Sequence, residues 1–331
     1  MKQIDFLAIG DIVTDAFIEL QDATVNCNIN TNECTISMKW GDKIPYKDVT
    51  IVKAVGNSPN AAVSASRLGL QTALVTNVGS DDFGKECINY LDQEKIDTTR
   101  ITTEKGKKTN YHYVLSYEAE RTILVKHEEF SYHFDMTIPS PQWIYLSSLA
   151  ENSLPYHMEI TEYLEQHPET KLAFQPGTFQ MKLGYQTLER LYRQSDLFFC
   201  NKEEAQRILE IDEQDIKKLL IEMHARGPKV VVITDGPKGA YAYDGTEGWY
   251  MPMYPDPKPP VERTGAGDSF SSTFTAAIAL GKSVPEALAW GPINSMNVVQ
   301  HIGAQKGLLS REALEKYLAE KPDHYVVKKI I

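Results

Sequence analysis

The feature that most constrains the fold is an alternation of short apolar runs with helix or turn signals. Six such runs occur, at residues 4–10, 72–78, 143–147, 171–174, 196–200 and 230–234. Strands that alternate with helices usually pair in parallel and are covered on both faces. We therefore expect an α/β fold with a doubly wound, mainly parallel sheet and helices on both faces.

Residues 17–55 break this alternation. Their polar and apolar side chains alternate between turn residues, which is typical of antiparallel strands. Residues 109–116 and 122–127 read as another strand pair with Glu120 and Arg121 between them. A small sheet inserted here could be a lid that closes over a site, an insertion without a functional role, or a dimer surface, and these interpretations do not exclude one another. We expect one domain over residues 1–331, with a β lid and a homodimer formed through it.

Composition narrows the classes of partner. The net charge of −11 argues against a nucleic acid or an anionic membrane as the main partner. No apolar run approaches the about 18 residues of a membrane span, and the start, MKQIDFLAIGD, does not read as a signal peptide. The four cysteines lack C-x-x-C spacing, so we expect reduced thiols in a cytoplasmic protein. Pairing of Cys27 with Cys34 is the less favoured alternative. The scattered histidines give little support to a transition-metal site.

Residues 262–281, ERTGAGDSFSSTFTAAIALG, contain a glycine turn that leads into a helix. Gly265 and Gly267 are separated by one residue, Asp268 follows at once, and Gly281 is placed to end the helix. Such a turn exposes backbone N–H groups at the positive end of the helix dipole and forms an anion site. The motif alone favours a tight turn with Asp268 as a cap. The rest of the chain favours a base that takes the proton from a hydroxyl attacking a phosphate.

Polar residues follow several of the expected strands, at the edge where α/β sheets bind ligands. Asp11 and Asp15 could bind sugar hydroxyls, but a turn cap and a solvated side chain fit as well. Asn201 and Glu204 could organise water around Mg²⁺, or could form a helix cap followed by an acidic first turn. Residues 234–239 form a glycine-rich turn that suits a nucleotide phosphate or ribose, or a plain hairpin.

The order of these strands and motifs along the chain resembles that of the ribokinase-like (PfkB) carbohydrate kinase family, which also contains nucleoside kinases. The similarity extends from Ile9-Gly-Asp11 to Gly303-Ala304 and is most specific at Arg263-Thr-Gly-Ala-Gly-Asp-Ser-Phe270. It implies that Gly265, Ala266 and Gly267 form an anion hole and that Asp268 is the catalytic base. We expect the acceptor to be bound by Asp11, Asp15, Gly56, Asn57, Asn60 and Tyr111. We expect the nucleotide to be bound by Asn201, Thr234, Gly236, Gly239, Gly265 and Asn297, with Glu204 holding Mg²⁺ through water.

The sequence departs from the family pattern at several positions. Val55 replaces the first glycine of a pair, and Asn57 stands where ribokinases proper have a lysine, which argues against ribose itself. Glu262 stands where members that use K⁺ often have aspartate, so activation by K⁺ is an open expectation. The stretch at residues 175–177, Gln-Pro-Gly, replaces a more polar strand end.

The resemblance implies an ATP-dependent kinase that phosphorylates a hydroxymethyl group of a small sugar, as fructokinases and ribokinases do. A nucleoside kinase of the adenosine kinase type is the first alternative. Aromatic residues in the acceptor pocket would favour it, with Phe17, Tyr111 and Tyr113 as candidates that core packing explains equally well. A non-catalytic family member that binds a nucleotide or metabolite is the second. An intact Asp268 argues against that second alternative, because a pure binder has no use for a carboxylate in an anion site.

Overall fold

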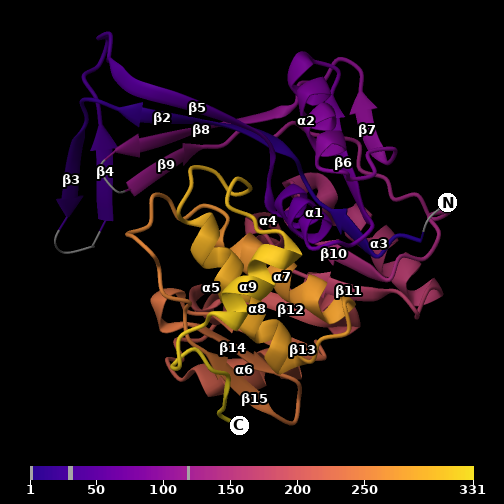
Figure 1. Cartoon of the computed structure of the whole chain (residues 1–331). Helices are drawn as coiled ribbons and strands as arrows, with labels where there is room; N and C mark the ends of the chain where they lie inside the picture. Colours follow the sequence, from indigo (N-terminus) through magenta and orange to yellow (C-terminus); the bar gives the residue numbers. More distant parts are fainter. Residues whose placement is uncertain (1–2, 29–32, 118–119) are drawn as a thin grey trace.

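A ten-stranded sheet forms the centre of the computed structural model, which describes residues 3–28, 33–117 and 120–331 (Figure 1). Seven neighbouring strands are parallel, and the last three at one edge are antiparallel. Across the sheet the strands are β16 (Lys328–Lys329), β15 (Gly248–Met251), β14 (Ala240–Tyr243), β13 (Val230–Thr234), β12 (Ser195–Asn201), β11 (Lys171–Phe174), β10 (Trp143–Leu146), β1 (Phe6–Ile9), β6 (Thr72–Gly79) and β7 (Ile101–Glu104). The predicted mainly parallel sheet is confirmed.

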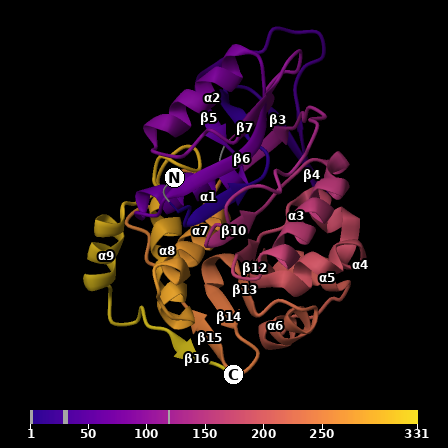
Figure 2. The same cartoon turned by 90° about the vertical axis from the view of Figure 1, so that its right-hand side faces the viewer.

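Helices cover both faces of this sheet, as Figure 2 shows. One face carries α1 (Asn57–Arg67), α2 (Asp82–Gln93), α7 (Ala266–Ala279), α8 (Val284–Val298) and α9 (Arg311–Ala319). The other carries α3 (Leu154–Gln166), α4 (Thr178–Gln194), α5 (Lys202–Leu209) and α6 (Ile216–Ala225). Short 3₁₀ turns lie at Glu151–Ser153 and Gly236–Lys238. Alternate residues of β1 supply the two cores, because Phe6 and Ala8 face one side and Leu7 and Ile9 the other. The predicted doubly wound fold is confirmed.

A separate small sheet, which we call the lid sheet, extends from one end of the molecule (Figure 1). Its strand order is β5 (Tyr46–Val55), β2 (Val13–Leu20), β8 (Asn110–Tyr117) and β9 (Glu120–Leu124), with a two-stranded hairpin of β3 (Thr24–Asn28) and β4 (Glu33–Ser37) beside it. The pairing of β2 with β8 is parallel, so the sheet is mixed rather than purely antiparallel. It begins at Val13, four residues before the expected start at Phe17, because Val13 already pairs with Val55.

The expected second strand pair is present, with one correction. Glu120 and Arg121 were expected between the two strands, but they open β9, where Arg121 pairs with Ser116. The ladder continues to the last described residue before the turn. Residues 118–119 and most of the turn expected at residues 28–33 lie outside the described ranges.

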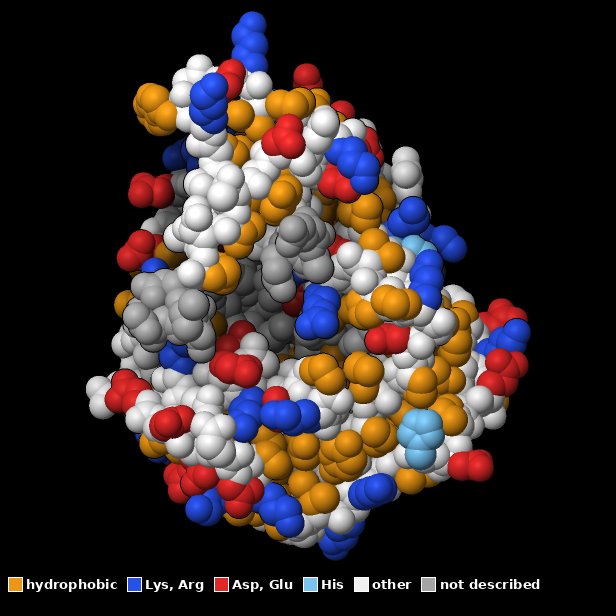
Figure 3. Space-filling view, turned by 90° about the vertical axis from the view of Figure 1, so that its left-hand side faces the viewer, with side chains coloured by type: hydrophobic (Ala, Val, Ile, Leu, Met, Phe, Trp, Pro, Cys, Tyr) orange, Lys and Arg blue, Asp and Glu red, His pale blue; other side chains and the backbone are white. Residues whose placement is uncertain are grey.

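The pairing register separates the two faces of the lid sheet. Asp15 pairs with His112, and Phe17 pairs with Val114; these four residues share one face, on which Phe17 and Val114 are buried. The opposite face carries a row of exposed apolar side chains, which we call the outer apolar face: Val49, Ile51, Tyr113 and Leu124, exposed by 41% to 53%. Figure 3 looks onto the lid end of the molecule and shows the surface hollowed beneath the lid sheet.

The cysteines differ from expectation. Cys27 and Cys34 form a disulfide, whereas Cys87 and Cys200 are buried free thiols. The two bonded residues lie seven positions apart but directly opposite each other in the β3–β4 hairpin, which brings their Cβ atoms within reach. The expectation of four reduced thiols was therefore wrong for this pair. Among the described residues, no helix is both long and apolar enough to cross a membrane.

Candidate active site

Asp268 lies in the first turn of α7 and accepts three amide hydrogen bonds. Asn57 Nδ2 and Gln175 Nε2 donate to its Oδ1 at 2.9 and 3.2 Å, and Asn60 Nδ2 donates to Oδ2 at 2.8 Å. Asn57 and Asn60 come from the first turn of α1, and Gln175 follows β11 directly. Three amides from two segments, the start of α1 and the end of β11, thus hold the carboxylate without supplying a positive charge.

The turn before Asp268 explains why the sequence has glycine there. Gly265 has φ +80° and caps α7, a left-handed conformation that favours glycine. A Cβ on Gly265 would lie 2.3 Å from the Cβ of Ala304. A Cβ on Gly267 would meet only Gln175 Nε2, at 3.9 Å, so backbone at this point is open to a ligand. The first turn of a helix leaves N–H groups without intrahelical acceptors. The open space beside Gly267 allows a ligand to approach these N–H groups.

Burial raises the pKa of Asp268, and the hydrogen bonds from Asn60, Gln175 and Asn57 partly oppose that rise. The net direction is upward from the ordinary value of an aspartate. A carboxylate with a raised pKa is a stronger base when ionised, which is the property that proton abstraction from an alcohol requires.

Gln175 was not among the expected site residues, although its position was noted as a departure from the family. Its Oε1 accepts from the hydroxyl groups of Tyr145 and Ser271, and these bonds turn Nε2 toward Asp268. The signal that could have identified it is its place immediately after the buried strand β11, at the ligand-binding edge of the sheet.

A cavity of about 630 Å³ opens in front of Asp268. Its lining includes residues from each expected group: Gly267 and Asp268 for catalysis, Asn57 for the acceptor, Asn201, Thr234 and Gly236 for the nucleotide, and Glu204 for Mg²⁺. A second cavity, of about 290 Å³, adjoins it and shares Thr234, Gly236 and Gly267. This second cavity is lined mainly by apolar groups, including Met253, Pro292 and Val299, and it also reaches Gly239 and Ala266.

Asn201 and Glu204 form a reciprocal cap at the start of α5. The side chain of Asn201 accepts from the Glu204 N–H at 2.8 Å, and Glu204 Oε2 accepts from the Asn201 N–H at 2.8 Å. Burial raises the pKa of Glu204, with a smaller contribution from the charge of Asp268. The described residues contain no group of three His, Cys, Asp or Glu side chains placed to bind a metal directly. Oxygen donors such as Glu204 fit a Mg²⁺ ion held mainly by phosphates and water.

Asp11 and Asp15 lie at the junction of the main sheet and the lid sheet, and each faces a histidine. Tyr132 donates to Asp11 Oδ1 at 2.7 Å, and His127 Nδ1 lies 3.6 Å from Asp11 Oδ2. His112 Nδ1 lies 3.5 Å from Asp15 Oδ1. Apart from these histidine contacts, the buried Asp11 Oδ2 and Asp15 Oδ1 accept no hydrogen bond from the residues that the structure describes. Buried carboxylate oxygens that accept no hydrogen bond can accept one from a hydroxyl group of a ligand.

Gly56 lies against Asp11, because a Cβ at Gly56 would stand 2.6 Å from the Asp11 backbone oxygen. His127 also lines a cavity of about 590 Å³ together with Phe179 and Glu128. The histidines and Tyr132 were not expected, since single histidines carry no recognisable spacing, whether within a strand, as His112 in β8, or after one, as His127 after β9.

Two expected residues are placed elsewhere. Tyr111 pairs with Thr14 and so lies on the opposite side of the lid sheet from Asp15, where its ring packs against Phe83 and Tyr113 with centroids 4.8 and 5.2 Å away. The side chain of Asn297 donates to the Gly307 backbone oxygen at 2.6 Å and lines neither of the two adjoining cavities.

Comparison with known proteins places this geometry in a family. Residues 29–311 match the sequence profile described as pfkB family carbohydrate kinase. The chain is 26% identical to a ribokinase of Haemophilus influenzae over 80% of its own length and 86% of that protein. Two solved structures share the fold. One is Arabidopsis thaliana ribokinase complexed with ribose and ATP, with a TM-score of 0.80, 19% identity and coverage of 96% and 99%.

The other is a putative ribokinase II from E. coli in complex with ATP and Mg²⁺, with a TM-score of 0.76, 16% identity and coverage of 96% and 99%. The family profile covers far more than half of the chain, and the fold agrees with it over nearly the whole length. The chain belongs to the pfkB family of carbohydrate kinases, which are phosphotransferases with an alcohol group as acceptor.

Proposed function

We propose that this sugar kinase transfers the γ-phosphoryl group of ATP to a hydroxymethyl group of a small sugar, with Asp268 as the base. The observation that carries the proposal is the Asp268 carboxylate, held by three neutral amides at the start of α7 beside an open cavity. Asp268 takes the proton of the alcohol as its oxygen attacks phosphorus. The N–H groups of the Gly265–Asp268 turn stabilise the charge on the transferred group.

The two adjoining cavities suggest how the nucleotide lies. The apolar cavity beside Met253 and Val299 fits the base, and the shared residues Gly236 and Gly267 form a passage for the triphosphate toward Asp268. Mg²⁺ would neutralise phosphate charge and would be held through water by Glu204 beside Asn201. Asn297, which the sequence suggested for the nucleotide, is not part of this proposal.

For the acceptor we propose Asp11 and Asp15 as the groups that bind hydroxyls, with Gly56, Asn57 and Asn60 between them and Asp268. Each aspartate has a buried oxygen that faces a histidine but accepts no hydrogen bond from the described residues, which supports this assignment. Tyr111 is left out because its ring packs between Phe83 and Tyr113. A nucleoside is the second candidate, since Phe179 and His127 give the acceptor side two rings whose centroids lie 5.9 Å apart. The intact Asp268 argues against a protein that only binds metabolites.

The carboxylate that bears on activation by K⁺ already has partners in the structure. The Glu262 carboxylate, which could take part in such a site, accepts from the Thr264 N–H at 2.7 Å and from Arg121 Nη1 at 2.5 Å. The guanidinium group already supplies a positive charge there. We therefore expect activity in buffers without K⁺, with at most a modest increase when K⁺ is added.

We also propose a homodimer formed through the outer apolar face of the lid sheet. Four apolar side chains exposed by 41% to 53% on one face of the lid sheet are the kind of patch that partners cover. Access to ATP and Mg²⁺ favours a cytoplasmic location. The Cys27–Cys34 disulfide means that reduced cysteines no longer support a cytoplasmic location.

A panel of sugars and nucleosides, each mixed with the protein, ATP and Mg²⁺, tests the proposal by coupled detection of ADP. We expect release of ADP that depends on a sugar with a primary hydroxymethyl group, and a phosphate ester at that carbon by ³¹P NMR. Release that depends on a nucleoside would favour the second candidate. ADP release independent of any alcohol would contradict the proposal.

A further inference from the structure

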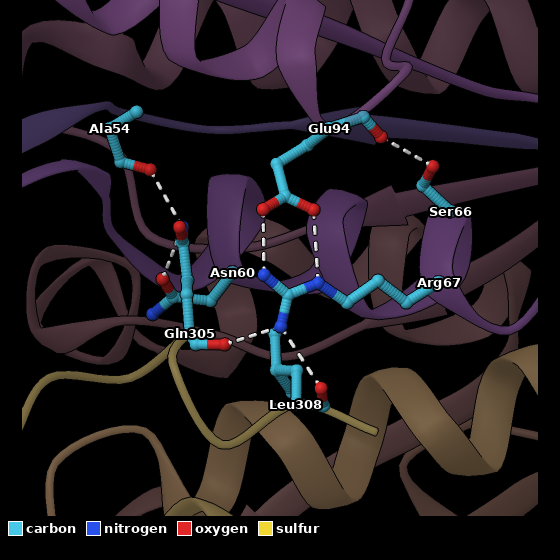
Figure 4. A network of polar contacts seen from close by, with 7 residues as sticks. All are labelled: Ala54, Asn60, Ser66, Arg67, Glu94, Gln305 and Leu308. Carbon is cyan, nitrogen blue, oxygen red and sulfur yellow. Dashed lines mark hydrogen bonds and ion pairs between the residues drawn. The ribbon is translucent and has the colours of Figure 1, made fainter. Parts of the chain in front are cut away.

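Gln305 does not contact Asp268 through its own hydrogen bonds but donates to Asn60, which is a direct hydrogen-bond partner of Asp268. It follows the Gly303–Ala304 turn after α8, and it is 1% exposed. Its Nε2 donates to the Ala54 backbone oxygen at 2.7 Å and to Asn60 Oδ1 at 2.9 Å, as Figure 4 shows. Asn60 Nδ2 in turn donates to Asp268 Oδ2 at 2.8 Å. A continuous chain of amides therefore leads from Gln305 to the carboxylate.

The ends of this chain determine how each amide is oriented. An ionised carboxylate only accepts hydrogen bonds, so Asn60 faces Asp268 with its NH₂ group and turns Oδ1 toward Gln305. Both partners of Gln305 are oxygen atoms, so Gln305 presents its NH₂ group and uses both hydrogens. A half-turn of either amide would set two acceptors against each other in a buried site, which is costly.

The backbone of Gln305 is fixed independently of its side chain. Arg67 Nη1 donates to the backbone oxygens of Gln305 and Leu308 at 2.8 and 2.9 Å. Arg67 is itself held by Glu94 through two hydrogen bonds of 2.9 and 2.6 Å (Figure 4). The loop that carries Gln305 is therefore anchored to α1 and to the end of α2.

The second acceptor of Gln305 lies where the lid sheet joins the body. Ala54 is the next-to-last residue of β5 and has φ +56°, a left-handed conformation that is uncommon for a residue with a Cβ. Gly56, two residues later, caps α1, the helix that carries Asn57 and Asn60. A hydrogen bond to the Ala54 oxygen thus stabilises the segment that sets the position of both asparagines.

We propose that Gln305 is a positioning residue, which holds the Asn60 amide with its NH₂ group toward Asp268 and ties that amide to the end of lid strand β5. This inference rests on the proposed role of Asp268 as the base. Without the hydrogen bond from Gln305, Asn60 can turn Oδ1 toward Asp268 and accept a hydrogen bond from the O–H of protonated Asp268. The loss of Gln305 therefore favours protonated Asp268, which cannot act as a base.

Other titratable groups lie near Asp268 or line the same cavity. Tyr145 comes from β10, and the carboxyl groups of Glu203 and Glu204 come from the start of α5. Asp235 and Lys238 line the same cavity from the turn after β13. None of them changes in a Gln305 variant, so a shift in the titration of Asp268 reports on the amide chain.

The test compares Gln305→Met with Gln300→Met. Gln300 is a matched control because it lies in the same loop, is 7% exposed and donates from Nε2 to the Lys258 backbone oxygen at 3.1 Å, whereas Gln305 donates to Asn60. We expect Gln305→Met to move the acid limb of the kcat–pH profile to higher pH. We expect kcat near pH 6.5 to fall roughly 2–10-fold, with an unchanged KM for ATP. Gln300→Met should leave the pH profile unchanged. If Gln305→Met does not fold, Gln305→Leu takes its place.

A measurement without turnover separates this inference from the proposed function. The ¹³Cγ resonance of Asp268, identified by its loss in Asp268→Asn, is titrated in protein free of nucleotide and Mg²⁺. We expect a higher pKa in Gln305→Met, and no such difference when the same change is made in an Asn60→Ala background. An unchanged titration, or an equal shift in the Asn60→Ala background, would overturn the inference. A wild-type protein with no kinase activity would refute the proposed function while leaving this titration decisive.

Discussion

At the scale of single residues, the unusual feature is a carboxylate surrounded by amides. Asn57, Asn60 and Gln175 stabilise the ionised form of Asp268 by hydrogen bonds, while burial raises its pKa. A lysine or arginine in their place would hold the carboxylate ionised more firmly and make it a weaker base. The neutral amides orient Asp268 and leave its basicity high.

Loss of one amide should therefore change the pH dependence in a known direction. Gln175 Nε2 stabilises the Asp268 carboxylate, so Gln175→Leu should raise the pKa of Asp268 further and move the acid limb of the kcat–pH profile upward. The profile is compared with that of Gln194→Leu, whose amide donates to the Thr161 backbone oxygen far from the site. A downward shift in Gln175→Leu would contradict this view of the amides.

Glu204 permits a prediction about stability. Its pKa is raised in the folded protein, so the folded state binds the proton more tightly than the unfolded state does. The linked stability is present at low pH and is lost as pH rises through the folded pKa. Glu204→Gln keeps an acceptor for the Asn201 N–H and should be more stable than wild type at pH 8 in urea unfolding without ligands. This advantage should shrink as pH falls toward 5, and a pH-independent difference would count against it.

Short-range spacing predicted the glycine turn and the helix that follows it, and the role proposed for Asp268 rested on the rest of the chain and on the family resemblance. Gln175 and Gln305 were not identified as site residues, since their contacts to Asp268 and Asn60 join positions 93 and 245 residues apart. Tyr111 is the reverse case: the sequence suggested it for the acceptor site, and the structure places it on the other side of the lid sheet. Its side of the lid sheet depends on the register of β8 against β2, which the sequence pattern did not reveal.

At the scale of elements, the lid sheet and the body meet at the loop that precedes α7. Arg121 in β9 donates to Glu262, whose carboxylate also accepts from the Thr264 N–H. This contact ties lid strand β9 to the turn that would hold the phosphoryl group. It offers a way for a closed lid to order the anion site.

Arg121→Met should loosen that connection. A partly exposed ion pair contributes about 0.2–1 kcal/mol, so we expect KM for the acceptor to rise by roughly 1.5- to 5-fold. ATP hydrolysis without acceptor should also increase, because water enters more easily. Lys47→Met is the matched control, since Lys47 pairs with Glu19 within the lid sheet at 2.6 Å. Equal effects of the two changes would show that the Arg121 contact has no special role.

At the scale of the whole molecule, the order of strands and helices was predictable from periodicity and the lid from its alternating pattern. The Cys27–Cys34 bond was not, because it depends on two strands facing each other at that register. The proposed homodimer depends on surface side chains and not on the order of strands and helices. The outer apolar face is the feature that bears on it.

A single charge on that face should prevent a dimer formed through it. Ile51 is 50% exposed and lies on the outer apolar face, on edge strand β5, so Ile51→Glu would place a carboxylate in an interface formed through that face. Sedimentation velocity should show a dimer for wild type and a monomer for Ile51→Glu. Met158→Glu, at a residue of α3 that is 57% exposed, should remain dimeric. A dimer in all three proteins would place the interface elsewhere.

The role of Asp268 is tested most directly by the turnover of Asp268→Asn on the acceptor that the panel identifies. The central claim predicts a loss of kcat on the order of 10²–10⁴, because proton abstraction is removed while the cavity and its amides remain. Thermal unfolding of the variant should stay close to that of wild type. A folded Asp268→Asn protein with nearly normal kcat would contradict the claim.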